Sequence, residues 1–113
     1  MSDKIRRLKE DMILVYGLKC WLNELWIPSK KDILTFHHIL EKRNGGKATW
    51  ENGALLSRSS HDYLNYLDNE YHKLYQELND LFIELNRTYK PPTKEYFNEV
   101  NYVLKKKRWY KWM

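Results

Sequence analysis

Apolar side chains recur at intervals of three and four residues near the start of the chain. Between residues 4 and 16 they are Ile5, Leu8, Met12 and Val15. This spacing predicts an amphipathic helix, because such residues share one helix face. Arg6, Arg7 and Lys9 would lie on its water-facing side. Gly17 interrupts the pattern, and Pro28 argues against regular structure in the segment up to residue 29.

The next pattern predicts a β-hairpin. Residues 33–40 read ILTFHHIL, and the β-branched and aromatic residues at its start favour a strand. Asn44-Gly45-Gly46 favours a turn or loop, since glycine accepts positive φ without steric cost. Residues 54–56, a short apolar run, would be the returning strand. The two strands would be joined by a loop of irregular length.

A leucine-rich stripe then predicts the longest element. Its members are Leu64, Leu67, Tyr71, Leu74, Leu78, Leu81 and Leu85. Either Ser59 or Ser60 can cap a single helix that carries this stripe to about Arg87. Two prolines at residues 91–92 end it. The stripe would pack in the core, and a homodimer seam through this long helix is the alternative.

A last helix is predicted after Thr93, which can cap it, and a basic aromatic tail follows from residue 105. The apolar positions of this helix are Tyr96, Phe97, Val100, Val103 and Leu104. The order of elements predicts one α+β domain, mostly helical, over residues 1–113. It comprises an N-terminal helix and connector (1–30), a hairpin–helix unit (31–68), and the rest of the long helix with the final helix and tail (69–113).

Composition narrows the class of protein. The 113 residues are 42% hydrophobic and 15% aromatic, which is typical of a globular chain. The net charge of +5 favours an anionic partner, with nucleic acid ahead of a membrane. Cys20 is the single cysteine, so no disulfide forms within one chain. We expect a cytoplasmic protein, because the sequence shows neither a signal peptide nor a membrane span.

Four features in the middle of the chain carry candidate chemistry. They are His37-His38 on the first strand, the Gly45-Gly46 loop, Asn52 ahead of the second strand, and His61 at the helix start. Over residues 33–66 this order and spacing resembles the signature of the HNH endonuclease family. That signature is an Asp or His followed by a His, a Gly-rich loop, an Asn before an apolar strand, and a His about nine residues later.

The resemblance implies a ββα-metal fold that holds one divalent ion between strand and helix. His37 takes the position of the first metal ligand, and His61 that of the helix ligand. Asn65 lies four residues beyond His61 on the same helix face, where some relatives carry a third ligand. His38 takes the general-base position, for which a pKa near neutral is suited. Asn52 takes the place of the asparagine that braces the loop and orients the base.

Strand geometry sets a condition on these roles. Side chains alternate along a strand, so His37 and His38 face one pocket only if the strand kinks or frays there. The ion would polarise the scissile phosphate and stabilise the leaving oxygen. Mg²⁺ or Mn²⁺ is expected first, with Zn²⁺ or Ni²⁺ as alternatives. Many relatives hold a structural zinc with two C-x-x-C pairs, but this chain has only Cys20, so no structural zinc is expected.

Basic residues in two segments are candidates for nucleic-acid contact. Those of the loop beside the histidine pair are Lys42, Arg43 and Lys47. Those of the tail are Lys105, Lys106, Lys107, Arg108 and Lys111, interleaved with Trp109. Lysines neutralise phosphates and aromatic rings stack on bases. The alternative for the tail is a frayed, solvated helix end.

The resemblance therefore predicts a metal-dependent endonuclease that hydrolyses DNA with low sequence preference. Small stand-alone members of the family are common in phages and other mobile elements. The first alternative is a catalytically inactive protein of the same fold that binds nucleic acid or acts as a regulator or inhibitor. The second alternative is a structural metal site, for which chelation would unfold the protein.

Overall fold

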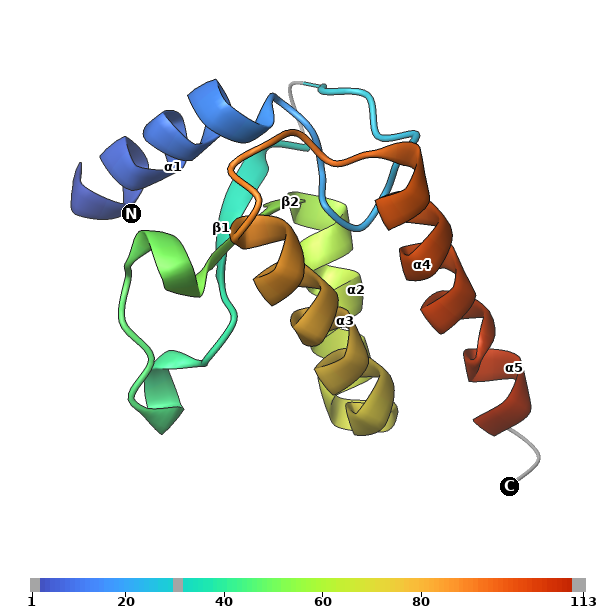
Figure 1. Ribbon diagram of the computed structural model, residues 1–113. Coiled ribbons are helices and arrows are strands. Elements are labelled where there is room, and N and C mark those ends of the chain that lie inside the picture. Colours follow the sequence, from blue (N-terminus) through green and yellow to red (C-terminus); the bar gives the residue numbers. More distant parts are fainter. Residues whose placement is uncertain (1–2, 30–31, 111–113) are drawn as a thin grey trace.

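The structure, a computed structural model, describes residues 3–29 and 32–110, with side chains up to Arg108 (Figure 1). The chain is a mostly helical α+β fold, as the sequence predicts. The longer elements are α1 (Asp3–Tyr16), β1 (Leu34–His38), β2 (Gly53–Ser57), α2 (Arg58–Glu70), α3 (His72–Asn86) and α4 (Lys94–Lys105). Two 3-10 turns, Lys42–Asn44 and Trp50–Asn52, lie between the strands, and α5 (Lys107–Tyr110) follows α4.

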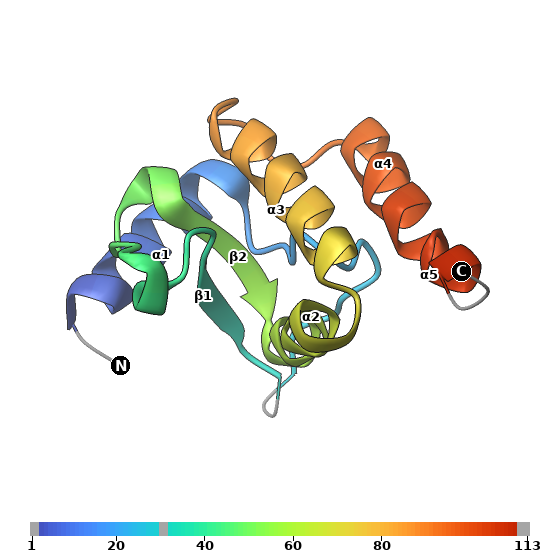
Figure 2. The same ribbon diagram turned by 90° about the horizontal axis from the view of Figure 1, so that it is seen from below.

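The two strands form an antiparallel hairpin at the centre of the molecule. Its register pairs Leu34 with Ser57 and His38 with Gly53. Both views place this hairpin between α1 on one side and the α2–α3 pair on the other (Figures 1 and 2). The hairpin is thus covered by helices that also enclose the core.

The connector after α1 adds large side chains to this core. Residues 20–22 are buried although they form no helix or strand. The backbone N–H of Trp21 donates to the carbonyl of Leu55 (2.8 Å), which links the connector to β2. Its ring meets the ring of Tyr16 edge to face, with centroids 5.0 Å apart. The connector is therefore a packed part of the fold.

The prediction of one long helix is wrong. The helix breaks at Tyr71, whose backbone (φ −142°, ψ 57°) is not helical. α3 then returns beside α2 (Figure 1). The break lets both halves of the leucine stripe enter one core, where Leu64 and Leu74 are fully buried. The suggested dimer seam loses its basis, because these leucines are buried within a single chain.

The predicted helix caps are half right. Thr93 caps α4 by accepting the N–H of Tyr96 (3.1 Å), as expected. The cap of α2 is Ser57, which accepts the N–H of Ser60 (3.2 Å), so neither Ser59 nor Ser60 is the cap. Over residues 3–29 and 32–110, no helix has both the length and the apolarity that crossing a membrane requires.

Candidate metal and catalytic site

A hollow of about 190 Å³ lies where the end of β1 meets α2 and α3. We call it the histidine hollow. It is lined by His37, His38, Glu41, Lys42, His61, Asn65 and Tyr75. The structure thus gathers the three motif histidines and Asn65 around one space. His38 also lines it; this residue is the last of β1, and the chain bends over residues 39–40.

His37 is the most deeply placed of these side chains. It is only 3% exposed, and its ring lies edge-on to the rings of Tyr75 and Phe82. Burial lowers its pKa to about 4. The imidazole is therefore neutral at pH 7, the form that binds a metal ion.

A chain of hydrogen bonds from α3 fixes the orientation of His37. Its Nε2 lies 2.9 Å from Oδ1 of Asn79. The side chain of Asn79 is also hydrogen-bonded to the hydroxyl oxygen of Tyr75. This bond lowers the pKa of Tyr75, as a donor to a phenol oxygen does. The amide NH₂ thus faces Tyr75, and the amide oxygen accepts Nε2–H of His37. Nδ1 of His37 keeps its lone pair.

Tyr75 connects this chain to a carboxylate. Its hydroxyl donates to Oε1 of Glu41 (2.9 Å). Burial raises the pKa of Tyr75 to about 12, so the phenol stays protonated and remains a donor. Each hydrogen bond in the series from His37 through Asn79 and Tyr75 to Glu41 therefore has one donor and one acceptor.

His61 is oriented in the same way by β1. Its Nδ1 lies 2.8 Å from Oγ1 of Thr35. The single hydroxyl proton of Thr35 goes to the carbonyl of Leu56 (2.8 Å), so the hydroxyl oxygen accepts Nδ1–H of His61. This leaves a lone pair on Nε2. Burial, and next the charge of Arg58, lower the pKa of His61 and favour its neutral form.

These residues fit a divalent ion. The ring centroids of His37 and His61 are 5.4 Å apart, and two imidazoles that share one ion place their ring centres roughly 5 Å apart. Asn65 adds an amide oxygen at the same hollow. In the part of the chain that is described, no three His, Cys, Asp or Glu side chains form a metal-binding group. The donor set is therefore two imidazoles with an amide, which suits a first-row transition ion better than Mg²⁺.

His38 differs from the two other histidines of the hollow. Its ring packs edge-on against Phe36, with centroids 5.0 Å apart. Its Nε2 is buried and has no hydrogen-bond partner in the structure. Burial, followed by the charge of Lys42, lowers the pKa of His38. A neutral imidazole with an uncommitted nitrogen can accept a proton.

Asn52 binds the loop that follows β1. Its side-chain NH₂ donates to the carbonyls of Leu40 and Lys47 (both 2.9 Å), and its Oδ1 accepts the N–H of Leu40 (2.6 Å). The loop also needs its glycines. Gly45 has φ 88°, and a Cβ on Gly46 would lie 1.7 Å from the Leu40 carbonyl oxygen. These contacts hold the end of β1, and with it His38, in place.

We expect Asn52→Ala to lower the free energy of unfolding by about 1–3 kcal/mol, because it removes three side-chain hydrogen bonds to the backbone of Leu40 and Lys47. Urea denaturation measures the change. Asn69→Ala is the matched control, since the side chain of Asn69 makes one exposed bond to the Asn65 carbonyl. Equal effects of the two substitutions would show that Asn52 does not brace the loop.

Acidification should destabilise the metal-free protein through His37. The pKa of His37 is about 4 when folded, against an ordinary value of 6.5, so the unfolded chain binds the proton first as pH falls. This contribution is complete above pH 6.5 and is lost progressively toward pH 4. Urea denaturation should show a loss of about 2 kcal/mol between pH 6.5 and pH 5. In His37→Gln the slope should be shallower, and an unchanged slope would contradict the assignment.

The basic loop residues predicted to contact nucleic acid differ in their exposure and in their ion pairs. Lys42 lines the histidine hollow, and Lys47 is exposed. Arg43 forms ion pairs with Glu41 and Asp68. The structure does not gather these loop residues with the tail, which lies beside α2 and α3.

In the tail, Lys105 and Arg108 are exposed. Lys106 pairs with Glu77 (2.8 Å). The ammonium group of Lys107 lies over the rings of Tyr63, Tyr66 and Tyr71, 4.9–5.5 Å from their centroids. The side chain of Trp109 and the whole of Lys111 lie outside the described residues.

The sequence reasoning missed four residues that support the site: Thr35, Glu41, Tyr75 and Asn79. Asn79 left one signal, since it is a polar residue directly after Leu78 in the leucine-rich segment, and it is only 8% exposed. A buried amide in such a position needs hydrogen-bond partners. The pattern does not show which partners these are.

The hairpin, the helix that follows it and the histidines at their junction define a ββα-type site. Residues 19–65 match the family model of the HNH endonuclease, and the three motif histidines, Asn52 and Asn65 lie within this segment. No curated protein and no solved structure gives a match. Tyr75 and Asn79 lie beyond the matched segment.

Proposed function

We propose that this protein is a metal-dependent endonuclease that hydrolyses DNA phosphodiester bonds at the histidine hollow. The observation that carries the proposal is the pattern of hydrogen bonds there. Thr35 and Asn79 each accept one N–H of a histidine, which leaves lone pairs on His61 and His37. Nε2 of His38, which lines the same hollow, has no hydrogen-bond partner. The two proposed ligands and the proposed base thus line a single space.

In this mechanism His37, His61 and Asn65 would hold one divalent ion, and the donor set favours Mn²⁺, Zn²⁺ or Ni²⁺ over Mg²⁺. The ion would supply Lewis-acid stabilisation of charge on the phosphate. His38 takes a proton at Nε2 from the attacking water, since its lowered pKa keeps the ring neutral at pH 7. Lys42, on the rim of the hollow, would attract the phosphate.

DNA is proposed as the substrate because the family acts on it and because the net charge is +5. The described residues include no element inserted for reading bases, so we propose low sequence preference. A single site in each chain would produce nicks. A protein that binds DNA through the same surface without cutting it is the main alternative outcome.

The test is conversion of supercoiled plasmid to the nicked form in Mn²⁺, Ni²⁺, Zn²⁺ or Mg²⁺, with EDTA as the metal-free arm. We expect nicking in at least one transition ion and none in EDTA. Equal rates for wild type and for the double variant His37→Ala/His61→Ala in every metal would remove the proposal. DNA binding in that case would support the non-catalytic alternative.

Asn79 should control the affinity of the site for metal although it does not touch the ion. We expect Asn79→Leu to weaken metal binding by about 10- to 100-fold, because the His37 ring loses the acceptor that fixes its tautomer. Isothermal titration calorimetry with Ni²⁺ measures the change. Two-bond ¹⁵N–¹H spectra of the metal-free protein should show Nε2–H in wild type and a tautomer mixture in the variant. Unchanged spectra and affinity would contradict this role.

A further inference from the structure

A second hollow, of about 310 Å³, lies between α1 and β1. We call it the α1 groove. Its lining includes Lys9, Leu34, Phe36, Arg58 and His61. Its volume is at the lower end of the range for small-molecule sites, about 300–1,000 Å³. Because His61 lines both spaces, the α1 groove adjoins the histidine hollow.

Lys9 places a fixed positive charge at this groove. The sequence pattern assigns it to the water-facing side of its helix, but it is half-buried. Its Nζ donates to the carbonyl of Leu34 (3.1 Å), which holds the ammonium group against β1. An ammonium group has three protons, so this bond leaves others for an anionic ligand.

Arg58 adds a second positive charge on the side of α2. Its guanidinium pairs with Asp62 (2.8 Å), and its side chain remains 54% exposed. Arg58 and His61 are three residues apart on α2, and both line the α1 groove. Arg58 therefore lies close to the histidine that the two hollows share.

The remaining walls of the groove are apolar. Leu34 and Phe36 belong to β1, and Ile5 and Ile33 extend the surface, with Ile33 55% exposed. A nucleotide has matching chemistry, because its phosphate pairs with cations and its sugar and base pack on apolar or aromatic surface. An all-apolar partner would leave Lys9 without a counter-charge.

We propose that the α1 groove binds the nucleotide next to the scissile phosphate, with Lys9 and Arg58 holding its phosphate. The proposal rests on the proposed function for the position of the reacting phosphate. The strand would run from the histidine hollow past His61 toward α1. α1 lies outside the segment that matches the HNH family model. Through Lys9 it would supply part of the contact with the substrate.

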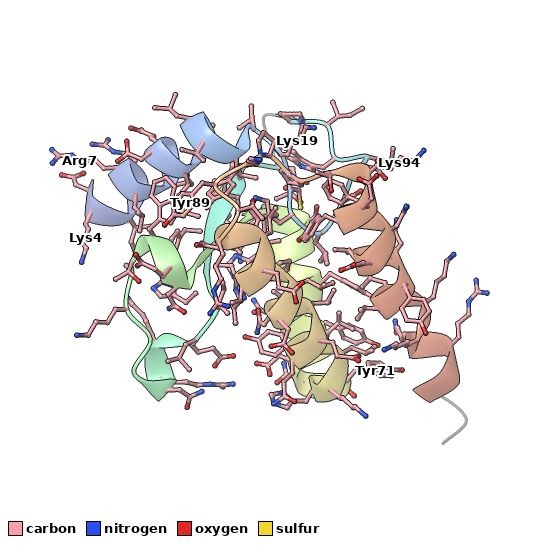
Figure 3. All side chains as sticks on the ribbon, viewed as in Figure 1. Lys4, Arg7, Lys19, Tyr71, Tyr89 and Lys94 are labelled. Atoms are coloured by element: carbon pink, nitrogen blue, oxygen red, sulfur yellow. The ribbon has the colours of Figure 1, made fainter. Side chains whose placement is uncertain are left out.

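The first experiment measures binding of a short fluorescein-labelled single-stranded DNA in EDTA, so that no cleavage occurs. We expect Lys9→Gln to weaken binding about five- to tenfold at 0.1 M salt and to reduce the salt slope by about one. Lys94→Gln is the control for net charge, since Lys94 lies on α4, at the opposite end of the molecule from Lys4 and Arg7 of α1 (Figure 3). Equal losses in the two variants would overturn the proposal.

The second experiment moves one neutral methylphosphonate linkage along the DNA. At one position the neutral linkage should weaken binding to the wild type but not to Lys9→Gln or Arg58→Gln. The side chain of Arg58 is exposed, so Arg58→Gln should not disturb folding. Equal weakening of all three proteins at every position would overturn the groove. Equal weakening together with plasmid nicking by the wild type would overturn the α1 groove as a binding site but leave the nuclease proposal intact. Weaker binding by Lys9→Gln, with no nicking in any metal, would overturn the nuclease proposal instead.

Discussion

His38→Ala is expected to slow DNA nicking by about 10²- to 10⁴-fold, the usual range for loss of a positioned general base. Among the described side chains, Nε2 of His38 is the one buried histidine nitrogen without a hydrogen-bond partner, so it is free to take a proton from water. Initial rates on supercoiled plasmid at saturating Mn²⁺ measure the change. Metal affinity should be unchanged, because His37 and His61 are the proposed ligands.

His72→Ala is the matched control for this substitution. His72 is an exposed histidine at the start of α3 that bonds Asp68 (2.8 Å) and does not line the histidine hollow. It should retain nearly full activity. Nicking by His38→Ala at the rate of His72→Ala would assign the proton transfer to another group.

His61→Ala should produce the second large effect, on metal binding itself. We expect the affinity for Ni²⁺ or Mn²⁺ to fall by about 100-fold or more, since loss of a direct ligand should cost at least as much as loss of its supporting bond. Titration calorimetry at pH 7 measures it. Nicking should fall in parallel and partly recover at high metal concentration.

Thr35→Val separates ligation from packing at this position. The substitution keeps the shape of the side chain but removes the acceptor of His61 Nδ1–H, so metal affinity should fall less than in His61→Ala. If His61→Ala binds the ion as tightly as wild type, His61 is not a ligand. If Thr35→Val matches His61→Ala, the threonine contributes more than orientation.

The hairpin and its loop were predictable from local physics. β-branched and aromatic residues favoured the first strand, a short apolar run favoured the second, and the Gly45-Gly46 pair favoured a turn or loop, in which a Cβ on Gly46 would meet the backbone. The motif spacing also placed His37, His38, His61 and Asn65 near one another, which agrees with the lining of the hollow. These features depend on residues close in sequence.

The break at Tyr71 was not predictable in this way. The segment Asn69-Glu70-Tyr71-His72 contains neither glycine nor proline, and the leucine spacing continues across it. The turn brings α3 back beside α2, and leucines of both helices, among them Leu64 and Leu74, are fully buried. This burial depends on tertiary packing, which a one-dimensional pattern does not contain.

The partners of the histidines were hidden for a similar reason. Asn79 bonds His37 across 42 residues, and Thr35 bonds His61 across 26. A motif gives the residues that a reaction needs, but the groups that fix their tautomers come from whichever elements pack nearby. Here those elements are β1 and α3, and α3 lies beyond the matched HNH segment.

The most direct test of the histidine hollow as the catalytic metal centre is a crystal structure with Mn²⁺, read by anomalous scattering. The predicted result is one ion bound by Nδ1 of His37 and Nε2 of His61, with Asn65 beside it and Nε2 of His38 facing the same space. Anomalous density at another place in a protein that nicks DNA, with none between His37 and His61, would contradict it.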